Sequence, residues 1–493
     1  MTCISDSRVS VFRTRAAAYP RVPPFHPGEA YPEAPFGDLA QEANYAYEAV
    51  RGSLWLAGLD RERFGTEEWN PLAGLLRPGQ CVLLKPNLVK ESHPRHPDGW
   101  QCVLTHGSVI RAVADYVWKA LDRRGTVIVA DSPQTDSSFA KICAVLGLNE
   151  VSRYYDAHGL DFRLVDLRRE EWESRGGVVV SRRSLAGDPF GYVEYDLKEA
   201  SELAGHPGAG RYYGADYDSR VVNRHHTDGR HEYLISGCAI HADAVVSIAK
   251  LKTHKKAGVT IALKNLVGIT GDKNYLPHHT EGAVAEGGDE RPLASLGTSV
   301  ERRSVAVLRR MSLGLPVVGP WIHRLARKAG RNVFGDTEEV VRSGNWWGND
   351  TVWRMCLDLN KLLCYGTRDG SLRSEGSSGR KPHLVVVDGI IAGQGRGPMN
   401  PDPHPAGVVA FGTNPPSVDA ACAGLMGFDP DRIPIIRHAF ACQRYPLTEW
   451  PWKDVRIVSN EPRWNTTLGD LPHEAALGFA PHFSWAGHIE WDR

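Results

Sequence analysis

The sequence predicts an α/β protein with two lobes, in which mostly parallel sheets flanked by helices lie around a central cleft. Three observations lead to this prediction. Short apolar runs alternate with helical patterns from residue 81 onward, as in chains that build parallel sheets. Several of these runs stop at polar residues, at the strand ends where open α/β sheets bind ligands. Two long segments break the alternation, and we interpret them as insertions.

The composition narrows the class of protein. A chain of 493 residues is long enough for several domains. It has 58 basic and 58 acidic residues, so its overall charge gives no reason to expect a nucleic-acid partner. Nine scattered cysteines without a Cys-x-x-Cys pair predict reduced thiols and a cytoplasmic location. No apolar run reaches the roughly 18 residues that a membrane span needs.

The first half of the chain divides at changes in this pattern. We expect an N-terminal arm and helix over 1–75, followed by the first lobe over 76–167. The apolar runs at 81–84, 126–130 and 162–166 predict the strands of this lobe, and the periodicity from 105 to 121 predicts a helix between the first two. Charged, glycine-rich sequence then predicts an inserted arm over 168–235.

The second half resumes the α/β pattern. Residues 236–270 are predicted to form a core element with a strand at 244–249 and a short buried helix at 258–269. A polar and basic insertion follows over 271–342. The second lobe is predicted over 343–460, with a helix at 349–365 and strands at 384–387 and 407–411, before a C-terminal tail over 461–493.

A lysine-rich stretch directly after the 244–249 run is the strongest functional signal. Lys250, Lys252 and His254 follow the predicted strand, and Lys264 and Asn265 lie on the polar side of the predicted helix. Free backbone N–H groups and the helix dipole favour anions at such a position. We interpret Lys252 and His254 as an acid/base pair, because histidine titrates near neutral pH and crowding lowers the pKa of a buried lysine.

The same arrangement recurs at five predicted strand ends: Lys85-Pro-Asn87, Asp131-Ser-Pro133, Lys250 to His254, Asp388-Gly389, and Thr413-Asn414 leading to Asp419. We expect these ends to line one cleft that binds an anionic, phosphorylated or carboxylated small molecule. The residues assigned to catalysis are Lys252, His254, Asp131 and Asp388. Those assigned to substrate binding are Lys85, Asn87, Lys250, Lys264, Asn265, Arg396 and Asn414. Isomerase or lyase chemistry is the expected reaction class.

Arg396 belongs to a glycine-rich run, Gly389 to Pro398, which lacks the pattern of a Walker loop and the helix of a dinucleotide-binding turn. An anion-binding loop and a plain ordered loop are both consistent with it. A metal site is a second hypothesis, because His278, His279, Glu281 and Asp289 supply ligands suited to a first-row divalent ion. That site would make the protein a metal-dependent redox enzyme or transferase.

The basic segment 301–331 supports two interpretations. Its arginines flank an apolar patch, which suits peripheral contact with an anionic membrane. The same pattern is typical of amphipathic helices that pack on the body of a protein or on a second subunit, so a homo-oligomer is also expected. Under the membrane interpretation, the protein is a non-catalytic anion-binding or membrane-peripheral protein.

These motifs together resemble the domain of unknown function 362 family. The likeness rests on Lys85-Pro-Asn87, Asp131-Ser-Pro133, Lys250-Leu-Lys-Thr-His254, Leu263-Lys-Asn-Leu-Val-Gly268, Val387-Asp-Gly389, Gly397-Pro398 and Val418-Asp419, and it spans residues 81 to about 430. The resemblance implies a two-lobed α/β plan, similar in outline to the nickel-dependent lactate racemases. Many members of the family carry iron–sulfur cysteines in a ferredoxin-like module. This chain departs from that pattern, so no iron–sulfur cluster is expected.

Overall fold

The computed structural model describes residues 6–96, 98–175, 178–214, 219–293, 340–375 and 381–492. The segment 301–331, for which membrane contact was expected, lies outside these residues. No helix in the described ranges is long and apolar enough to cross a membrane.

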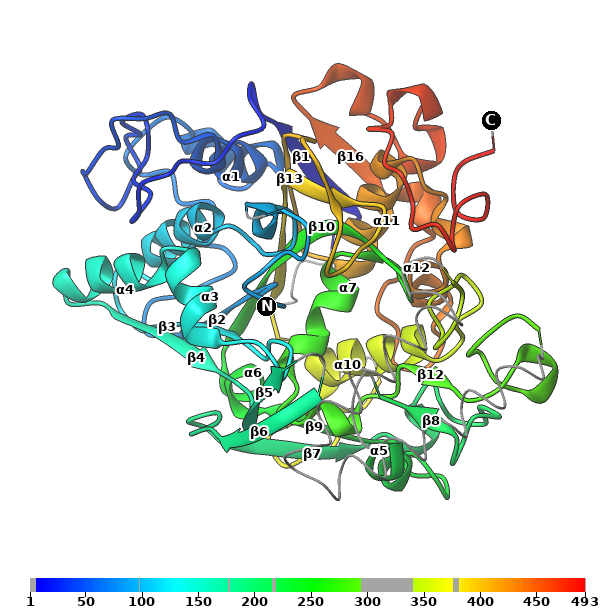
Figure 1. Cartoon of the computed structure of the whole chain (residues 1–493). Helices are drawn as coiled ribbons and strands as arrows, with labels where there is room; N and C mark the ends of the chain where they lie inside the picture. The colour runs from blue at the N-terminus through cyan, green and yellow to red at the C-terminus, as the bar shows by residue number, and fades with distance from the viewer. Residues whose placement is uncertain are drawn as a thin grey trace.

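A central sheet of ten strands organises the molecule (Figure 1), in the order β16-β1-β15-β13-β10-β2-β3-β4, with β11 on β10 and β14 on β13. Five adjacent strands, β13, β10, β2, β3 and β4, run parallel. The strands are β1 (Arg8–Arg13), β2 (Cys81–Pro86), β3 (Thr126–Asp131), β4 (Asp161–Asp166), β10 (Ala244–His254), β11 (Gly258–Thr260), β13 (His383–Gln394), β14 (Asp402–His404), β15 (Val408–Gly412) and β16 (Arg456–Ser459). The prediction of a mostly parallel α/β sheet is confirmed.

Helices cover both faces of this sheet. On one face lie α1 (Tyr45–Leu56), α2 (Gly107–Ala120), α3 (Phe139–Val145) and α4 (Leu148–Ala157); on the other lie α6 (Gly237–His241), α7 (Ala262–Asn265), α10 (Val352–Tyr365), α11 (Pro415–Met426) and α12 (Pro434–Ala441). Successive strand residues alternate between the two cores: Val82 and Leu84 enter the first and Leu83 the second. This period of two is what a sheet buried on both faces requires.

Smaller ribbons come mainly from the predicted inserted arm. β5 (Glu170–Arg175) pairs with β6 (Val178–Ser184), and β7 (Tyr192–Asp196) pairs with β9 (Glu232–Ser236). β8 (Tyr212–Tyr213) precedes α5 (Ser219–His225) and pairs with β12 (His279–Thr280). The segment after residue 271 therefore packs on the arm.

Two features of the predicted layout differ in the structure. The strands assigned to separate lobes form one sheet, because β10 hydrogen-bonds to β2 on one side and to β13 on the other. The N-terminal arm is also part of this sheet, since β1 lies between β15 and β16. Its partners are about 400 positions away in the chain, as in the pairing of Val9 with Gly412, and local pattern cannot reveal such contacts.

The central strands also continue beyond their predicted ends. β10 extends to His254 with every residue buried, and β13 extends to Gln394. Lys250, Lys252 and Asp388 consequently lie inside strands instead of in loops. The predicted helix 258–269 is divided into β11, the single turn α7 and a 3₁₀ turn over Leu266–Ile269.

Candidate functional site

Two buried ion pairs lie near the carboxyl ends of the parallel strands. Lys85 on β2 contacts Asp131 at the end of β3, with 2.9 Å between Nζ and Oδ1. Lys250 on β10 contacts Asp388 on β13, with 3.0 Å between Nζ and Oδ2. All four side chains are buried. The charges of Lys85 and Lys250, which we expected to hold a substrate anion, are thus compensated within the protein.

Both carboxylates are further saturated by hydrogen bonds. Asp131 accepts from the backbone N–H of Leu88 at 2.6 Å and from that of Ser132 at 2.7 Å. Asp388 accepts from the hydroxyl of Tyr19 at 2.5 Å and from the N–H of His106 at 2.9 Å. These contacts give both carboxylates a positioning role: Asp131 fixes the residues that follow β2 and β3, and Asp388 fixes the start of α2 and the N-terminal arm.

Two buried amides connect the ion pairs to the lysine-rich stretch. Asn265 on α7 donates to the backbone oxygen of Lys85 at 3.0 Å and to the hydroxyl of Ser247 at 2.9 Å. Asn87 donates to the side-chain oxygen of Asn265 at 3.1 Å and accepts from Lys252 Nζ at 2.9 Å. The amides therefore hold α7 and Lys252 in place.

Lys252 is fully buried without a carboxylate. Its ammonium donates to Asn87 and, at 2.5 Å, to the backbone oxygen of Val103. No acidic side chain in the described part of the chain forms an ion pair with it. Burial, together with the positive charges of Lys250 and Lys264, lowers the pKa of Lys252 to about 7. An amine with this pKa exchanges a proton readily at neutral pH.

Lys264, on α7, is the least compensated cation of the site. The residue is only 8% exposed, and its ammonium has no hydrogen-bond or ion-pair partner among the described residues. Burial lowers its pKa. The charge of Lys264 also lowers the pKa of Lys252, His254 and His278, so the four groups share one environment. We call these four residues the Lys/His cluster.

The two histidines of the Lys/His cluster are held in different tautomers. His254 Nδ1 accepts from the backbone N–H groups of Lys256 and Ala257, at 3.0 and 3.1 Å, which assigns the ring proton to Nε2. His278 Nδ1 donates to the backbone oxygen of Leu276 at 2.9 Å, which leaves the lone pair on Nε2. Burial, and next the charge of Lys264, holds the pKa of both rings well below the usual range. Both rings are therefore neutral, one a donor and the other an acceptor.

The four side chains proposed as metal ligands do not come together. Asp289 uses one oxygen for the N–H of Thr280 and the other for the N–H of Asp350 and the hydroxyl of Thr351. His279 Nδ1 lies 3.2 Å from the ammonium of Lys256. Within the described ranges, no group of three or more His, Cys, Asp or Glu side chains is placed to bind a metal ion.

Asn414 and Arg396, which were also predicted to bind the substrate, make their contacts outside the Lys/His cluster. Asn414 caps α11 by accepting from the N–H of Ser417 at 3.0 Å, and its amide donates to the backbone oxygen of Leu447 at 2.9 Å. Arg396 is exposed in the bend after β13, and its charge lowers the pKa of His482. Asn414 thus has a structural contact set, and Arg396 is a surface cation.

Three residues that the sequence analysis overlooked or assigned to other roles complete the site. His278 belongs to the Lys/His cluster, although its neighbour His279 made a metal site the more obvious hypothesis. Tyr19 comes from the N-terminal arm and has no local signal. Asp419, which the sequence placed after the last polar strand end, accepts from the N–H groups of Ala262 and Leu263 at 2.8 and 3.2 Å. It thereby anchors the start of α7.

A glycine sets the distance between α7 and the first ion pair. A Cβ at Gly268 would lie 1.8 Å from Asp131 Oδ1 and 2.7 Å from Lys85 Nζ. We expect Gly268→Ala to force the pair apart and lower the free energy of unfolding by about 1–3 kcal/mol, measured by urea denaturation. Gly74→Ala is the control, because a Cβ there meets nothing within 4 Å. Equal stability of the two variants would contradict this packing.

The fold and the site define the class: an α/β protein with buried lysines and histidines at the carboxyl ends of parallel strands. The chain belongs to the family described as Domain of unknown function (DUF362), whose model matches residues 82–188 and 197–424. Among curated proteins, it is similar to a thylakoid-associated protein of Synechocystis sp. The two are 23% identical over 368 residues, which cover 74% of this chain and 69% of the relative.

Proposed function

We propose that the chain is an enzyme that binds a carboxylated or phosphorylated small molecule at the Lys/His cluster and moves a proton on it, as isomerases and lyases do. The observation that supports this most is Lys264, a residue that is only 8% exposed and whose ammonium has no partner among the described residues. An uncompensated buried cation is unfavourable in the free protein. An anionic ligand would compensate it.

The neighbours of Lys264 supply the groups that proton transfer needs. The Nε2–H of His254 is a neutral donor suited to a developing oxyanion. Lys252, with a pKa of about 7, is the group that would take a proton from carbon next to a carbonyl, and His278 Nε2 is a second acceptor. Return of the proton to a neighbouring atom gives an isomerase, whereas loss of a leaving group gives a lyase.

Deuterium incorporation tests this proposal on many candidate substrates at once. The wild-type protein is incubated in D₂O with a desalted pool of cellular metabolites, and the pool is then read by mass spectrometry. We expect at least one carboxylate or phosphate compound to gain deuterium with the wild type and not with Lys252→Met. A pool labelled equally by both proteins, or by neither, would contradict the enzymatic proposal.

The pKa of Lys252 predicts a pH dependence of stability. Its folded-state pKa of about 7 is below the value of about 10.4 in an unfolded chain. Between these values the unfolded chain binds more protons, so the free energy of unfolding rises with pH. We expect the wild type to gain about 1.4 kcal/mol per pH unit relative to Lys252→Met between about pH 7 and 9. The free energy of unfolding is measured by urea denaturation at each pH. If it changes with pH equally in the two proteins, the lowered pKa is refuted.

One observation favours a second candidate, a peripheral membrane protein. The curated relative is named as thylakoid-associated, and segment 301–331 combines basic and apolar residues. Flotation with anionic liposomes, with and without this segment, separates this candidate from the first. Flotation that requires the segment supports membrane association through 301–331, and absence of flotation of the full-length protein argues against this candidate.

A further inference from the structure

A polar pocket of about 240 Å³ lies beside the Asp131-Ser132-Pro133 strand end, apart from the Lys/His cluster residues. Its lining includes Ser132, Thr135, Arg169, Glu170, Asp272 and Lys273. The volume is below the roughly 300–1,000 Å³ usual for drug-sized ligands. The pocket therefore suits a small polar molecule.

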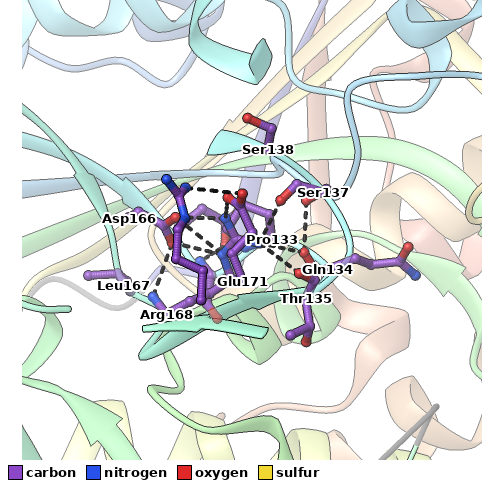
Figure 2. A network of polar contacts seen from close by, with 12 residues as sticks. Pro133, Gln134, Thr135, Ser137, Ser138, Asp166, Leu167, Arg168 and Glu171 are labelled. Atoms are coloured by element: carbon purple, nitrogen blue, oxygen red, sulfur yellow. Dashed lines mark hydrogen bonds and ion pairs between the residues drawn. The ribbon is translucent and has the colours of Figure 1, made fainter. Parts of the chain in front are cut away.

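Arg168, a buried residue that belongs to the lining of this pocket, is held by the polar contacts drawn in Figure 2. Arg168 donates from Nη1 to the backbone oxygens of Gln134 and Ser137, at 2.7 and 2.8 Å, and from Nη2 to Asp166 and Glu171, at 2.7 and 3.1 Å. Only 2% of Arg168 is exposed. It is thus occupied with holding the loop that carries Thr135, and this part of the lining is formed before any ligand arrives.

Among the described residues, the cations Lys273 and Arg169 have fewer hydrogen-bond and ion-pair partners than Arg168. Lys273 donates to the backbone oxygens of Ser132, at 2.6 Å, and Pro133, and no carboxylate of the described residues pairs with it. Arg169 has a side chain that is 55% exposed, and its guanidinium lies 3.7 Å from the carboxylate of Asp272. Both can still donate to an oxyanion.

The lining also contains neutral donors and charged acceptors. The hydroxyl of Ser132 is buried and has no hydrogen-bond partner among the described residues, and Thr135 adds a second hydroxyl. Glu170 and Asp272 are acceptors. A ligand that pairs with all of these groups must accept hydrogen bonds at one end and donate hydrogen bonds at the other.

We propose that this pocket binds a small phosphorylated polyol. The phosphate would contact Arg169, Lys273 and the Ser132 hydroxyl, and the hydroxyl groups of the ligand would donate to Glu170 and Asp272. A phosphate monoester matches this set because its three terminal oxygens accept from donors on several sides, and arginine–phosphate contacts are among the strong charged hydrogen bonds. This site goes beyond the proposed function, since its residues are separate from the Lys/His cluster.

Glycerol 3-phosphate is a suitable probe, measured by isothermal titration calorimetry on the full-length protein. We expect saturable binding to the wild type and about ten- to hundredfold weaker binding to Arg169→Gln, because a charged hydrogen bond contributes about 1.5–3 kcal/mol. Arg163→Gln is the matched control: Arg163 is exposed on β4, pairs with Asp161 and does not line the pocket. Arg169 is exposed enough that its replacement should leave the fold intact.

Lys264→Met separates this pocket from the Lys/His cluster. The proposal expects Lys264→Met and Arg163→Gln to bind the probe as the wild type does. It is overturned if the wild type shows no binding, if Arg169→Gln binds with unchanged affinity, or if Lys264→Met loses binding while Arg169→Gln keeps it. The last result would place the phosphate in the cluster instead.

Discussion

Replacement of Lys264 by methionine is expected to stabilise the protein while it removes the proposed anion site. Methionine keeps the length of the side chain but takes an uncompensated ammonium out of a buried position. Leaving a buried polar group unsatisfied costs about 1–3 kcal/mol, so we expect the free energy of unfolding to rise by that amount. Gains in stability at the expense of function are typical of binding sites.

The same variant has an effect that a purely structural residue would not show. Because the charge of Lys264 lowers the pKa of His254 and His278, the pKa of both rings should rise in Lys264→Met. Histidine-selective NMR during a pH titration measures this shift. Lys141→Met, at an exposed position on α3, is the control and should leave both rings unchanged. Unchanged histidine titration in Lys264→Met would show that the four groups do not share an environment.

Loss of the Asp131 carboxylate is expected to be the most destabilising single change at the strand ends. Asp131→Ala leaves the buried Lys85 ammonium without its counter-charge and the N–H groups of Leu88 and Ser132 without their acceptor. Removal of one partner from a buried ion pair costs about 3–5 kcal/mol. Urea denaturation of the variant should show a loss of this size.

Two comparisons give this prediction its specificity. Asp161→Ala removes an exposed carboxylate paired with Arg163 and should cost less than about 1 kcal/mol. The double variant Lys85→Met with Asp131→Leu should recover part of the stability, because an apolar pair can replace a buried ion pair. If Asp131→Ala were no less stable than Asp161→Ala, the pair would not anchor β2 to β3.

The sequence predicted the architecture well where the signal is local. Alternating apolar runs identified β2, β3, β4, β10, β13 and β15, and the periodicity after residue 105 identified α2. β1 was missed because its apolar pattern is only six residues long. Its partner, β15, begins at Val408, far away in the sequence. The strands assigned to the two lobes join one sheet, which the sequence did not indicate for the same reason: the contacts that join β10 to both neighbours are long-range.

The charged residues of the sequence predicted the site less reliably than the apolar pattern predicted the fold. Lysines after an apolar run usually mark a strand end, since burial of a charge is costly. Here β10 continues through Lys250 and Lys252, because Asp388 neutralises the charge of Lys250 and Asn87 accepts a hydrogen bond from Lys252, both from distant parts of the chain. Sequence alone could not separate these satisfied lysines from Lys264, which has the same residue type and a similar local context. To distinguish these lysines, one must know which groups contact each ammonium in the folded protein.

The most direct test of the central claim is to measure which anions the Lys/His cluster retains. Wild type, Lys264→Met and Lys141→Met are equilibrated with the same pool of cellular metabolites, washed, and analysed for bound compounds by mass spectrometry. We predict that the wild type and Lys141→Met retain a carboxylate or phosphate compound that Lys264→Met does not. Retention of the same compounds by all three proteins, or by none, would contradict an anion site at Lys264.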